Sequence, residues 1–374
     1  MRVLHIHSGN LYGGVETLLV TLARHRHLCP SMEPYFALCF QGRLSEELVA
    51  LGACVHLLGE ARVRNPLSVW RSRSMLGRVL RERHIDIAIC HSTWPQAIFG
   101  PAVRRARLPL VLWLHNAAQG HHWLDYWAQL TTPDLIVCCS LFTLSTLPRS
   151  YPTVSNQLIR CPVSPVLPRA LDSVRHAIRA KLNVATQTTV IVQSSRMEAL
   201  KGHSLLLQAL SLLKDNPGWL AWIVGGAQRT KEAHYLNKLI EEAAAMGIKD
   251  RVMFLGQRSD VPQILAAADI HCQPNIGPEA FGITFVEALY AGVPVVTTAM
   301  GGAQEIVDDS CGITIPPSDP EALAAALRNL IQDVNFRRRL GAAGPNRARQ
   351  LCDPDAQMAR LTEALSTVLK NFAS

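Results

Sequence analysis

Two glutamates, Glu279 and Glu287, stand with seven residues between them around a Phe-Gly pair, directly before an apolar helical run. A glycine loop that leads into a helix presents unpaired backbone N–H groups and the positive end of the helix dipole, which favour an anion such as phosphate. Ionised glutamates cannot bind that anion, but they accept hydrogen bonds from hydroxyl groups. A second flexible loop, Gly301-Gly302, follows the next apolar strand. The combination predicts a ligand that is part phosphate and part sugar, as a nucleotide-sugar is.

Basic residues in another loop match the phosphate part of such a ligand. Arg196 and Lys201 lie between a predicted strand and a helix. Arginine binds phosphate oxygens as a planar fork and lysine as a point charge, so the pair suits a diphosphate. Near the N-terminus, Gly13-Gly14 joins a strand to a helix and lets the backbone approach a phosphate or a sugar closely. The glycines there do not have the Gly-x-Gly-x-x-Gly spacing of dinucleotide-binding loops.

Two histidines end predicted strands. His115 ends the strand Leu110–His115, and His91 ends the strand Ile85–His91. In open parallel sheets, ligands bind outside the carboxyl ends of the strands. We therefore expect His115 to lie in a binding cleft, whereas His91 is more readily interpreted as structural.

The elements that position these residues alternate between short apolar runs and longer amphipathic ones, which predicts βαβ units and parallel sheets. A chain of 374 residues is also too long for one ordinary core. The proline-rich stretch Cys161–Pro168 is interpreted as a linker. The predicted strands are Val3–His7, Tyr35–Phe40, Cys54–Leu58, Ile85–His91, Leu110–His115 and Leu135–Ser140 before the linker, and Thr189–Ser194, Trp219–Val224, Val252–Leu255, Ile270–Pro274, Pro294–Thr298 and Gly312–Ile315 after it.

The predicted fold is therefore α/β, with two Rossmann-like doubly wound domains at residues 1–168 and 169–352. We expect these domains to face each other across a cleft that receives the carboxyl ends of both sheets. Near the end of the second domain, a helix is predicted over Asn335–Ala343. A final helix within residues 353–374 is expected to pack back towards the N-terminal domain.

The net charge of +8 belongs entirely to the N-terminal half of the chain. Residues 1–170 contain 17 Arg, no Lys and 9 acidic residues, whereas residues 171–374 contain 20 basic and 20 acidic residues. Many of the arginines lie between Arg62 and Arg83, a run that could contact an anionic membrane surface or an anionic acceptor. The plainer interpretation is a solvated helix face. Nucleic-acid binding is not expected, because the chain has no recognised nucleic-acid module and no interleaving of aromatic and basic residues.

The composition of the chain also bears on the cellular compartment in which we expect the protein. No apolar run reaches the roughly 18 residues that span a bilayer, and the N-terminus lacks a run of signal-peptide length. Ten cysteines show no metal-type spacing, so we interpret them as free thiols that act as small hydrophobic residues. We expect a cytoplasmic protein, with peripheral contact at the inner membrane face as an open alternative.

These features together resemble the retaining GT-B-fold glycosyltransferases of family 4 (glycosyl transferases group 1) over essentially the whole chain. The resemblance rests on the order and spacing of several motifs: the Glu279-x7-Glu287 pair around Phe281-Gly282, the Arg196-x4-Lys201-Gly202 loop, Gly13-Gly14, the strand-end His115, and the run Gly256–Asp269, which is similar to the family's base-binding region.

For the phosphates, the resemblance implies that Arg196 and Lys201 bind the donor diphosphate and stabilise the negative charge of the leaving group. Gly13 and Gly14 would bring backbone N–H groups to the same phosphates.

For the sugars, the resemblance implies that Glu279 binds hydroxyls of the transferred sugar, with the backbone of Phe281, Gly282 and Ile283 lining sugar and phosphate. Glu287 would bind the ribose hydroxyls. His115 would lie near the anomeric centre and the C6 group of the sugar, as an active-site residue rather than an established base.

The implied activity is retaining transfer of a sugar from a UDP- or GDP-type donor to a glycan, lipid-linked or small-molecule acceptor. Neither a cofactor nor a metal is expected, since Arg196 and Lys201 can neutralise the charge that a metal neutralises in other glycosyltransferases. The one Asp-x-Asp sequence, Asp353-Pro-Asp355, fits a capped helix start instead. Two alternatives stay open: a non-catalytic nucleotide-sugar binder, and a nucleotide-sugar epimerase on the same fold.

Overall fold

The computed structural model describes residues 1–118, 120, 122–165 and 172–373. The chain forms two compact units: unit 1 comprises Met1–Val163 and Cys352–Ser374, and unit 2 comprises Ser164–Leu351. Each unit is an α/β sandwich built on a parallel sheet, which confirms the predicted fold class. The predicted domain boundary at residue 168 lies outside the described residues.

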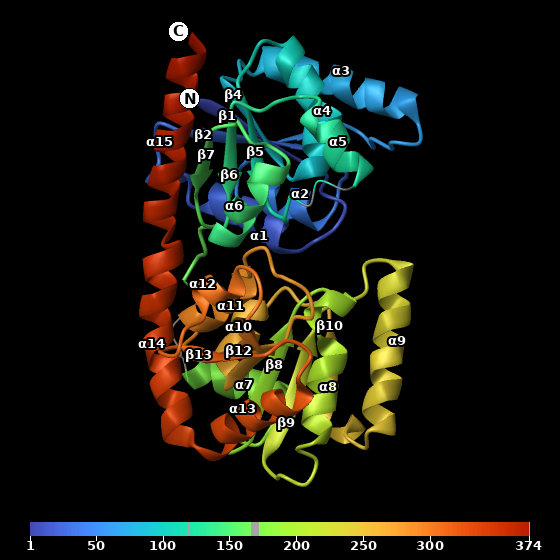
Figure 1. Cartoon of the computed structure of the whole chain (residues 1–374), viewed down its shortest axis with the longest axis vertical. Helices are drawn as coiled ribbons and strands as arrows, with labels where there is room; N and C mark the ends of the chain where they lie inside the picture. Colours follow the sequence, from blue (N-terminus) through green and yellow to red (C-terminus); the bar gives the residue numbers. More distant parts are fainter. Residues whose placement is uncertain (119, 121, 166–171, 374) are drawn as a thin grey trace. The chain divides into compact units, whose positions relative to one another are not determined.

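Unit 1 contains a seven-stranded parallel sheet with the order β3-β2-β1-β4-β5-β6-β7, and helices lie on both of its faces (Figure 1). Its strands are β1 (Arg2–His7), β2 (Glu33–Leu38), β3 (Cys54–Leu57), β4 (Ile87–His91), β5 (Leu110–Leu114), β6 (Leu135–Cys138) and β7 (Asn156–Leu158). Its helices are α1 (Gly14–Arg24), α2 (Arg43–Ala50), α3 (Pro66–Glu82), α4 (Thr93–Arg105), α5 (Trp123–Gln129), α6 (Leu141–Thr146) and α15 (Pro354–Ala373), with short 3₁₀ turns at Arg26–Leu28 and Leu147–Arg149.

Unit 2 contains a six-stranded parallel sheet with the order β10-β9-β8-β11-β12-β13. Its strands are β8 (Thr189–Ser194), β9 (Trp219–Val224), β10 (Val252–Gly256), β11 (Ile270–Gln273), β12 (Val295–Thr298) and β13 (Gly312–Ile315). Its helices are α7 (Asp172–Lys181), α8 (His203–Ser211), α9 (Thr230–Ala245), α10 (Val261–Ala267), α11 (Ile283–Tyr290), α12 (Ala303–Ile306), α13 (Pro320–Gln332) and α14 (Val334–Cys352, whose last residue is grouped with unit 1), with 3₁₀ turns at Ala199–Lys201 and Lys249–Arg251.

Both sheets reverse their strand order at one point. In unit 1 the reversal lies between β1 and β4, and in unit 2 it lies between β8 and β11. At such a topological switch point the loops after the two strands diverge and leave room for a ligand. The predicted site residues follow these strands: Gly13 follows β1, Lys201 follows β8 and Glu279 follows β11. In each unit, the sheet order therefore brings candidate site residues to the switch point.

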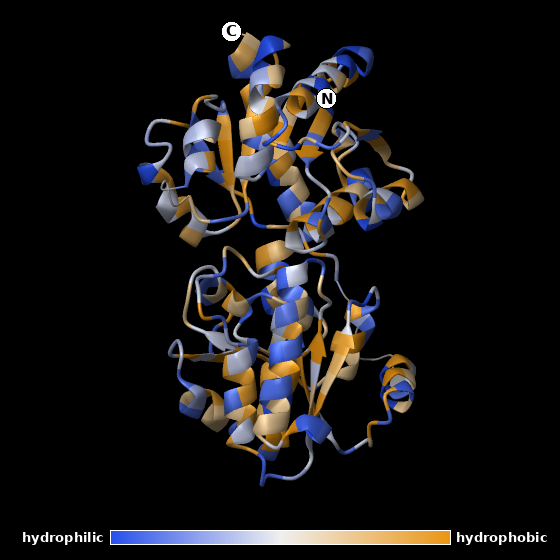
Figure 2. Cartoon of the chain, turned by 90° about the vertical axis from the view of Figure 1, so that its right-hand side faces the viewer, coloured by the Kyte–Doolittle hydropathy of each residue, from blue (hydrophilic) through white to orange (hydrophobic). Residues whose placement is uncertain are grey.

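The inner strands form the core of each unit because they are buried on both faces, as parallel strands between helices must be; the edge strands β3 and β7 are more exposed. Every residue of β4, β5 and β8 is buried, and the largest fully buried side chains include Trp113 and Trp222. The helices alternate hydrophobic and hydrophilic residues instead (Figure 2). All ten cysteines are free, and only Cys54 is exposed, in agreement with their interpretation as apolar packing residues.

The helix α14 extends beyond the predicted Asn335–Ala343 to Cys352, and two of its glycines serve for close packing. A Cβ on Gly341 would lie 2.3 Å from the carbonyl oxygen of Gly292, and one on Gly344 would lie 2.7 Å from that of Leu289. Helix propensity is lost at these two positions so that α14 can approach α11 and the turn after it. The helix α15 then begins with the predicted cap: the Asp353 carboxylate accepts a hydrogen bond from Ala356 N at 3.1 Å.

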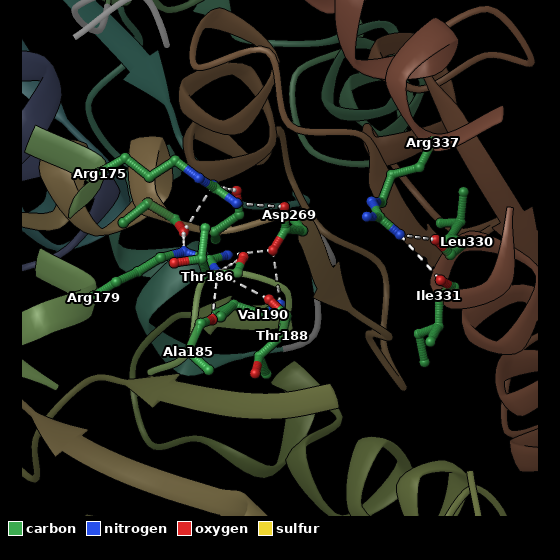
Figure 3. Close-up of polar contacts among 12 residues, drawn as sticks. Arg175, Arg179, Ala185, Thr186, Thr188, Val190, Asp269, Leu330, Ile331 and Arg337 are labelled. Atoms are coloured by element: carbon green, nitrogen blue, oxygen red, sulfur yellow. Dashed lines mark hydrogen bonds and ion pairs between the residues drawn. The ribbon is translucent and has the colours of Figure 1, made fainter. Parts of the chain in front are cut away.

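A buried charge network secures α7 to the sheet of unit 2 (Figure 3). The Asp269 carboxylate accepts from Arg175 Nη2 at 2.8 Å, from Arg179 Nη2, and from the backbone N–H of Val190 at 2.9 Å. Arg179 also donates to four backbone carbonyls at 2.9–3.3 Å, those of Ala267, Ala185, Thr186 and Thr188. Asp269 ends the run that resembles a base-binding region, and both of its oxygens are engaged in this structural network.

Candidate donor site

The centre of the site in unit 2 is an ion pair between residues of two predicted motifs, the Arg196–Lys201 loop and the Glu279–Glu287 pair. Lys201 Nζ lies 2.5 Å from Glu279 Oε2, and the two side chains are only 18% and 16% exposed. Two amides converge on the same oxygen, Gln273 Nε2 at 3.3 Å and Asn275 Nδ2 at 3.4 Å. A charge-assisted contact in such a sheltered place is stronger than one in open water. The site therefore combines a fixed cation, a carboxylate and amide donors at the ends of β8 and β11.

Gly202 places Lys201 in this arrangement. Its backbone has a φ of +71°, and a Cβ there would lie 1.7 Å from the carbonyl oxygen of Pro274. No other residue fits so close to the backbone of the loop after β11. The contact is extended by the N–H of Ile276, which donates to Leu200 O at 3.0 Å, and by Gln193 Nε2, which donates to Lys201 O at 2.7 Å.

Glu279 is fixed by the loop after β12. The N–H of Gly302 donates to Glu279 O at 2.7 Å, and a Cβ on Gly301 would lie 2.3 Å from the same oxygen. Gly301 also has a φ of +60°. These two glycines allow a close and specific contact that orients the glutamate.

Arg196 occupies the same loop as Lys201 but forms a separate pair. Its Nη1 lies 2.8 Å from Glu198 Oε1, and its side chain is 36% exposed. Between them, Met197 is buried and anchors the loop in the core. The structure thus brings Lys201 and Glu279 together, while the Arg196 side chain pairs with Glu198 and stays partly exposed.

The second glutamate of the motif, Glu287, has a different environment. Burial raises the pKa of its carboxyl to about 7, because no charge or hydrogen bond among the described residues compensates for lost hydration. The helix that carries it, α11, begins after Gly282 at a φ of +103°, where a Cβ would lie 2.3 Å from the Phe285 ring. The Phe281 side chain is buried, so this position can offer a ligand mainly its backbone, whereas Ile283 is only half-buried.

Replacing Glu287 with glutamine tests this environment. Because the folded-state pKa of about 7 exceeds the unfolded value of 4.5, the carboxyl of the wild-type protein costs stability progressively as the pH rises from about 4.5 to about 7. We expect Glu287→Gln to stabilise the fold at pH 8 by about 1–2 kcal/mol. This gain is smaller than the free energy that corresponds to the full pKa difference, because the side chain keeps some solvent contact. The gain should shrink towards zero near pH 5. Urea unfolding at both pH values measures it, and a pH-independent difference would contradict the assignment.

In unit 1, a carboxylate from the first turn of α1 accepts a hydrogen bond from the backbone of the glycine loop that follows β1. Gly13 caps α1, and its N–H donates to Glu16 Oε2 at 2.8 Å. The other oxygen of Glu16 lies 2.7 Å from His7 Nε2, and both side chains are 9% exposed. A phosphate at Gly13 would have to displace this internal hydrogen bond, so a role of Gly14 in phosphate binding is the simpler prediction.

His115 is the outer member of a row of histidines. It follows β5, and its Nε2 lies 3.0 Å from His91 Nδ1; His91 Nε2 in turn lies 2.9 Å from His5 Nδ1. Burial, with a further contribution from His7, lowers the pKa of His115 to about 3, so its ring is neutral at physiological pH. His91 thus supports the residue that the strand-end position singled out, a connection that spacing along the chain cannot reveal.

Gln273 and Asn275 were missed by the sequence analysis. Their signal in the sequence was weak, since it consists of two polar residues at the carboxyl end of a predicted strand. In the structure, Thr297 and Thr298 of β12 donate hydrogen bonds to the backbone carbonyls of Gln273 and Asn275 at 2.9 and 2.7 Å. Polar side chains at that end of a parallel strand are candidates for ligand contact.

Comparison with known proteins identifies the family. The model for Glycosyltransferase Family 4 matches residues 12–165, and the model for Glycosyl transferases group 1 matches residues 174–347, so one model falls on each unit. The chain belongs to the family 4 glycosyltransferases. The resemblance inferred from the Glu279–Glu287 motif is confirmed.

Relatives of this glycosyltransferase agree with that assignment. It is 27% identical to a GDP-mannose-dependent monoacylated alpha-(1-6)-phosphatidylinositol monomannoside mannosyltransferase of Corynebacterium glutamicum, over 72% of this chain and 73% of the relative. It is 33% identical to a phosphatidyl-myo-inositol mannosyltransferase of Mycobacterium leprae, over 43% of this chain and 42% of the relative. The crystal structure of Anabaena Alr3699/HepE in complex with UDP-glucose matches with a TM-score of 0.87 at 24% identity, over 98% of this chain and 100% of the other, and so shows the GT-B fold.

Proposed function

We propose that this glycosyltransferase is a retaining, metal-independent enzyme that moves a sugar from a UDP- or GDP-type donor bound by unit 2. The observation that carries the proposal is the sheltered Lys201–Glu279 pair at 2.5 Å, which joins a phosphate-binding cation to a hydroxyl-binding carboxylate. Both groups are needed for a ligand that is part diphosphate and part sugar. The amides of Gln273 and Asn275, which contact the same carboxylate, add hydrogen-bonding groups for such a ligand.

The pair suggests how the residues would act on a donor. A bound diphosphate would compete with Glu279 for the Lys201 ammonium, and the released carboxylate would then accept hydrogen bonds from sugar hydroxyls. As the bond between the anomeric carbon and the diphosphate breaks, negative charge grows on the leaving oxygen. A cation already fixed at that position stabilises the transition state more than the ground state. Arg196 would add a second positive charge, which supports metal independence.

Glu287 is suited to the nucleoside end of the donor. Its carboxyl sits in a poorly hydrated environment without a partner among the described residues, so two ribose hydroxyls would supply the hydrogen bonds that it lacks. A carboxyl that has lost part of its hydration gains from a ligand that donates hydrogen bonds to it. This assignment separates the two glutamates, with Glu279 for the transferred sugar and Glu287 for the ribose.

A thermal-shift screen with nucleotide-sugars tests donor binding. A ligand at 100 times its dissociation constant stabilises the folded state by about 2.7 kcal/mol. We expect at least one UDP- or GDP-sugar to raise the unfolding temperature, and to do so equally in excess chelator. If no nucleotide-sugar shifts the transition, the donor assignment is wrong; a shift that chelator abolishes would overturn metal independence.

The acceptor is proposed to be lipid-linked and reached at an anionic membrane surface. None of the helices that the structure describes is long and apolar enough to cross a bilayer, so contact would be peripheral. On α3, Leu67 and Trp70 are 67% and 66% exposed among arginines, and the helix borders a groove of about 580 Å³ that Arg81, Arg105 and Trp127 also line. Exposed tryptophan beside arginine is typical of interfacial helices. The names of the two actinobacterial relatives, which describe phosphatidylinositol-type acceptors, support the same class.

Arg73 differs from its neighbours on α3. Its guanidinium donates to Ile98 O at 2.5 Å and to Ala97 O at 3.3 Å. Pro101 lies inside α4 and has no N–H for the carbonyl four residues earlier, that of Ala97. Arg73 therefore satisfies a backbone group of α4, and the surface-binding role falls to the exposed arginines.

Neutralising two of those exposed arginines tests the membrane contact. Each basic residue near an anionic surface contributes about 1 kcal/mol, so Arg71→Gln with Arg78→Gln should weaken binding to phosphatidylglycerol vesicles at low salt by roughly 30-fold. Vesicle sedimentation measures the change. The matched control is Arg338→Gln with Arg349→Gln, two exposed arginines of α14, which should have little effect. Equal binding by both double variants would remove α3 as the contact.

A further inference from the structure

Three buried histidines of unit 1 form one hydrogen-bonded row. His5 in β1 contacts His91 in β4 through Nδ1 and Nε2 at 2.9 Å, and His91 contacts His115 through Nδ1 and Nε2 at 3.0 Å. His5 and His91 are fully buried, and His115 is 9% exposed. The rings of His91 and His115 are nearly parallel at 7°, with centroids 5.3 Å apart. Phe36 stacks on His5 and Trp113 stacks on His91, so packing holds the row in place.

The row has only two consistent arrangements of protons. A neutral imidazole has one N–H donor and one acceptor nitrogen. Burial lowers the pKa of His5 to about 3 and that of His91 well below its usual value, so these rings are neutral, as is His115. Each of the two contacts needs one donor and one acceptor. The middle ring must therefore donate on one side and accept on the other. The direction from donor to acceptor is then the same in both hydrogen bonds of the row.

The surroundings of His5, at the inner end of the row, determine which of the two proton arrangements is present. His5 Nε2 is buried and has no hydrogen-bond partner among the described residues. In one direction this nitrogen would carry a proton and be an orphaned donor; in the other it would be a bare acceptor. Among backbone groups, orphaned buried N–H donors are rarer than under-satisfied acceptors, and we extend this preference to the ring nitrogen of His5. His5 therefore donates through Nδ1 to His91, and His91 donates through Nδ1 to Nε2 of His115.

We propose that His5 and His91 are positioning residues that hold His115 in the tautomer with its proton on Nδ1. Nε2 of His115 accepts from His91, so Nδ1 is the nitrogen that can meet a ligand. This atom has no partner among the residues that the structure describes, and it is not fully buried. His115 thus presents a hydrogen-bond donor, which can bind a hydroxyl or phosphate oxygen, and does not serve as a base. For Nδ1 to accept a proton, the whole row would have to reverse and place an N–H on His5 Nε2.

The identity of the oxygen that His115 binds rests on the proposed function, but the tautomer does not. Long-range ¹H–¹⁵N correlation spectra of the ¹⁵N-histidine-labelled protein report which ring nitrogen carries the proton, without any donor or acceptor present. We expect a protonated Nδ1 and an unprotonated Nε2 for both His91 and His115. A protonated Nε2 on His115 in the wild-type protein would overturn the proposal, whatever the enzyme does with nucleotide-sugars.

Variants then test the positioning role. His91→Phe should release His115 into a mixture of tautomers and lower kcat/KM about tenfold, the value of one hydrogen bond of ordinary strength. It should have little further effect in a His115→Phe background, because both changes remove the same interaction. The control is His271→Phe, which removes another fully buried histidine, in unit 2, and should leave the His115 spectrum unchanged. The proposal would be contradicted by an unaltered His115 tautomer in His91→Phe. It would also be contradicted if the losses of kcat/KM in His91→Phe and His115→Phe added up in the double variant. The wild-type spectrum decides the question alone if His91→Phe does not fold.

Discussion

Lys201→Ala is expected to lower turnover about 100- to 1,000-fold, the usual effect of removing one fixed charge-stabilising group from an active site. The Lys201 ammonium is the sheltered cation of the donor site and would meet the diphosphate as its charge grows. The fold should survive, because Gln273 and Asn275 still donate to the Glu279 carboxylate. Steady-state kinetics with the donor found by the thermal-shift screen measure the loss. Most of it should appear in kcat, since the interaction strengthens in the transition state.

The control for this change is Lys238→Ala. Lys238 lies on α9 of the same unit, is 66% exposed and forms only a long contact of 3.6 Å with Glu242. We expect nearly unchanged kinetics from it, and circular dichroism of both variants should match that of the wild type. Near-normal rates in Lys201→Ala would remove the phosphate-binding assignment and, with it, the interpretation of the pair with Glu279.

Asp269→Asn should destabilise unit 2 by about 3–5 kcal/mol, because removing one member of a buried ion pair leaves its partners uncompensated. Asp269 is 5% exposed and holds two guanidinium groups, those of Arg175 and Arg179. An asparagine can still accept hydrogen bonds, but the two positive charges would then repel each other in a poorly hydrated environment. Chemical unfolding followed by circular dichroism measures the change.

Asp260→Asn is the matched comparison. Asp260 also pairs with an arginine, Arg258, and hydrogen bonding by that arginine lowers the pKa of the Asp260 carboxyl. Its side chain is 30% exposed, and such pairs contribute about 1 kcal/mol or less. If both variants lose equal stability, the network of Figure 3 does not secure α7 as described.

The strands could be predicted closely from the sequence because their signal is local. Thr189–Ser194 and Gly312–Ile315 are apolar runs bounded by polar or turn residues, and the structure has strands with those same bounds. Local patterns mislead where a glycine serves a distant partner. The helix end predicted at Ala343 precedes Gly344, whereas the structure continues α14 to Cys352 and uses the missing side chain of Gly344 for contact with Leu289.

The site was predictable in its residues but not in its contacts. Lys201 and Glu279 are 78 positions apart and touch only because β8 and β11 are neighbours at the switch point of the sheet. The same holds for the histidine row, in which His5 and His91 are 86 positions apart. Spacing along the chain indicates which residue types are present for chemistry. The order of the strands decides which of them meet.

The proposed function is tested most directly by the release of nucleoside diphosphate from a panel of UDP- and GDP-sugars by the purified chain in excess chelator, with and without lipid-linked acceptors. We expect release from at least one donor, transfer of the sugar with its anomeric configuration retained, and loss of both in Lys201→Ala. No release from any donor, or conversion of a donor sugar to its C2 epimer without transfer, would contradict the proposed function.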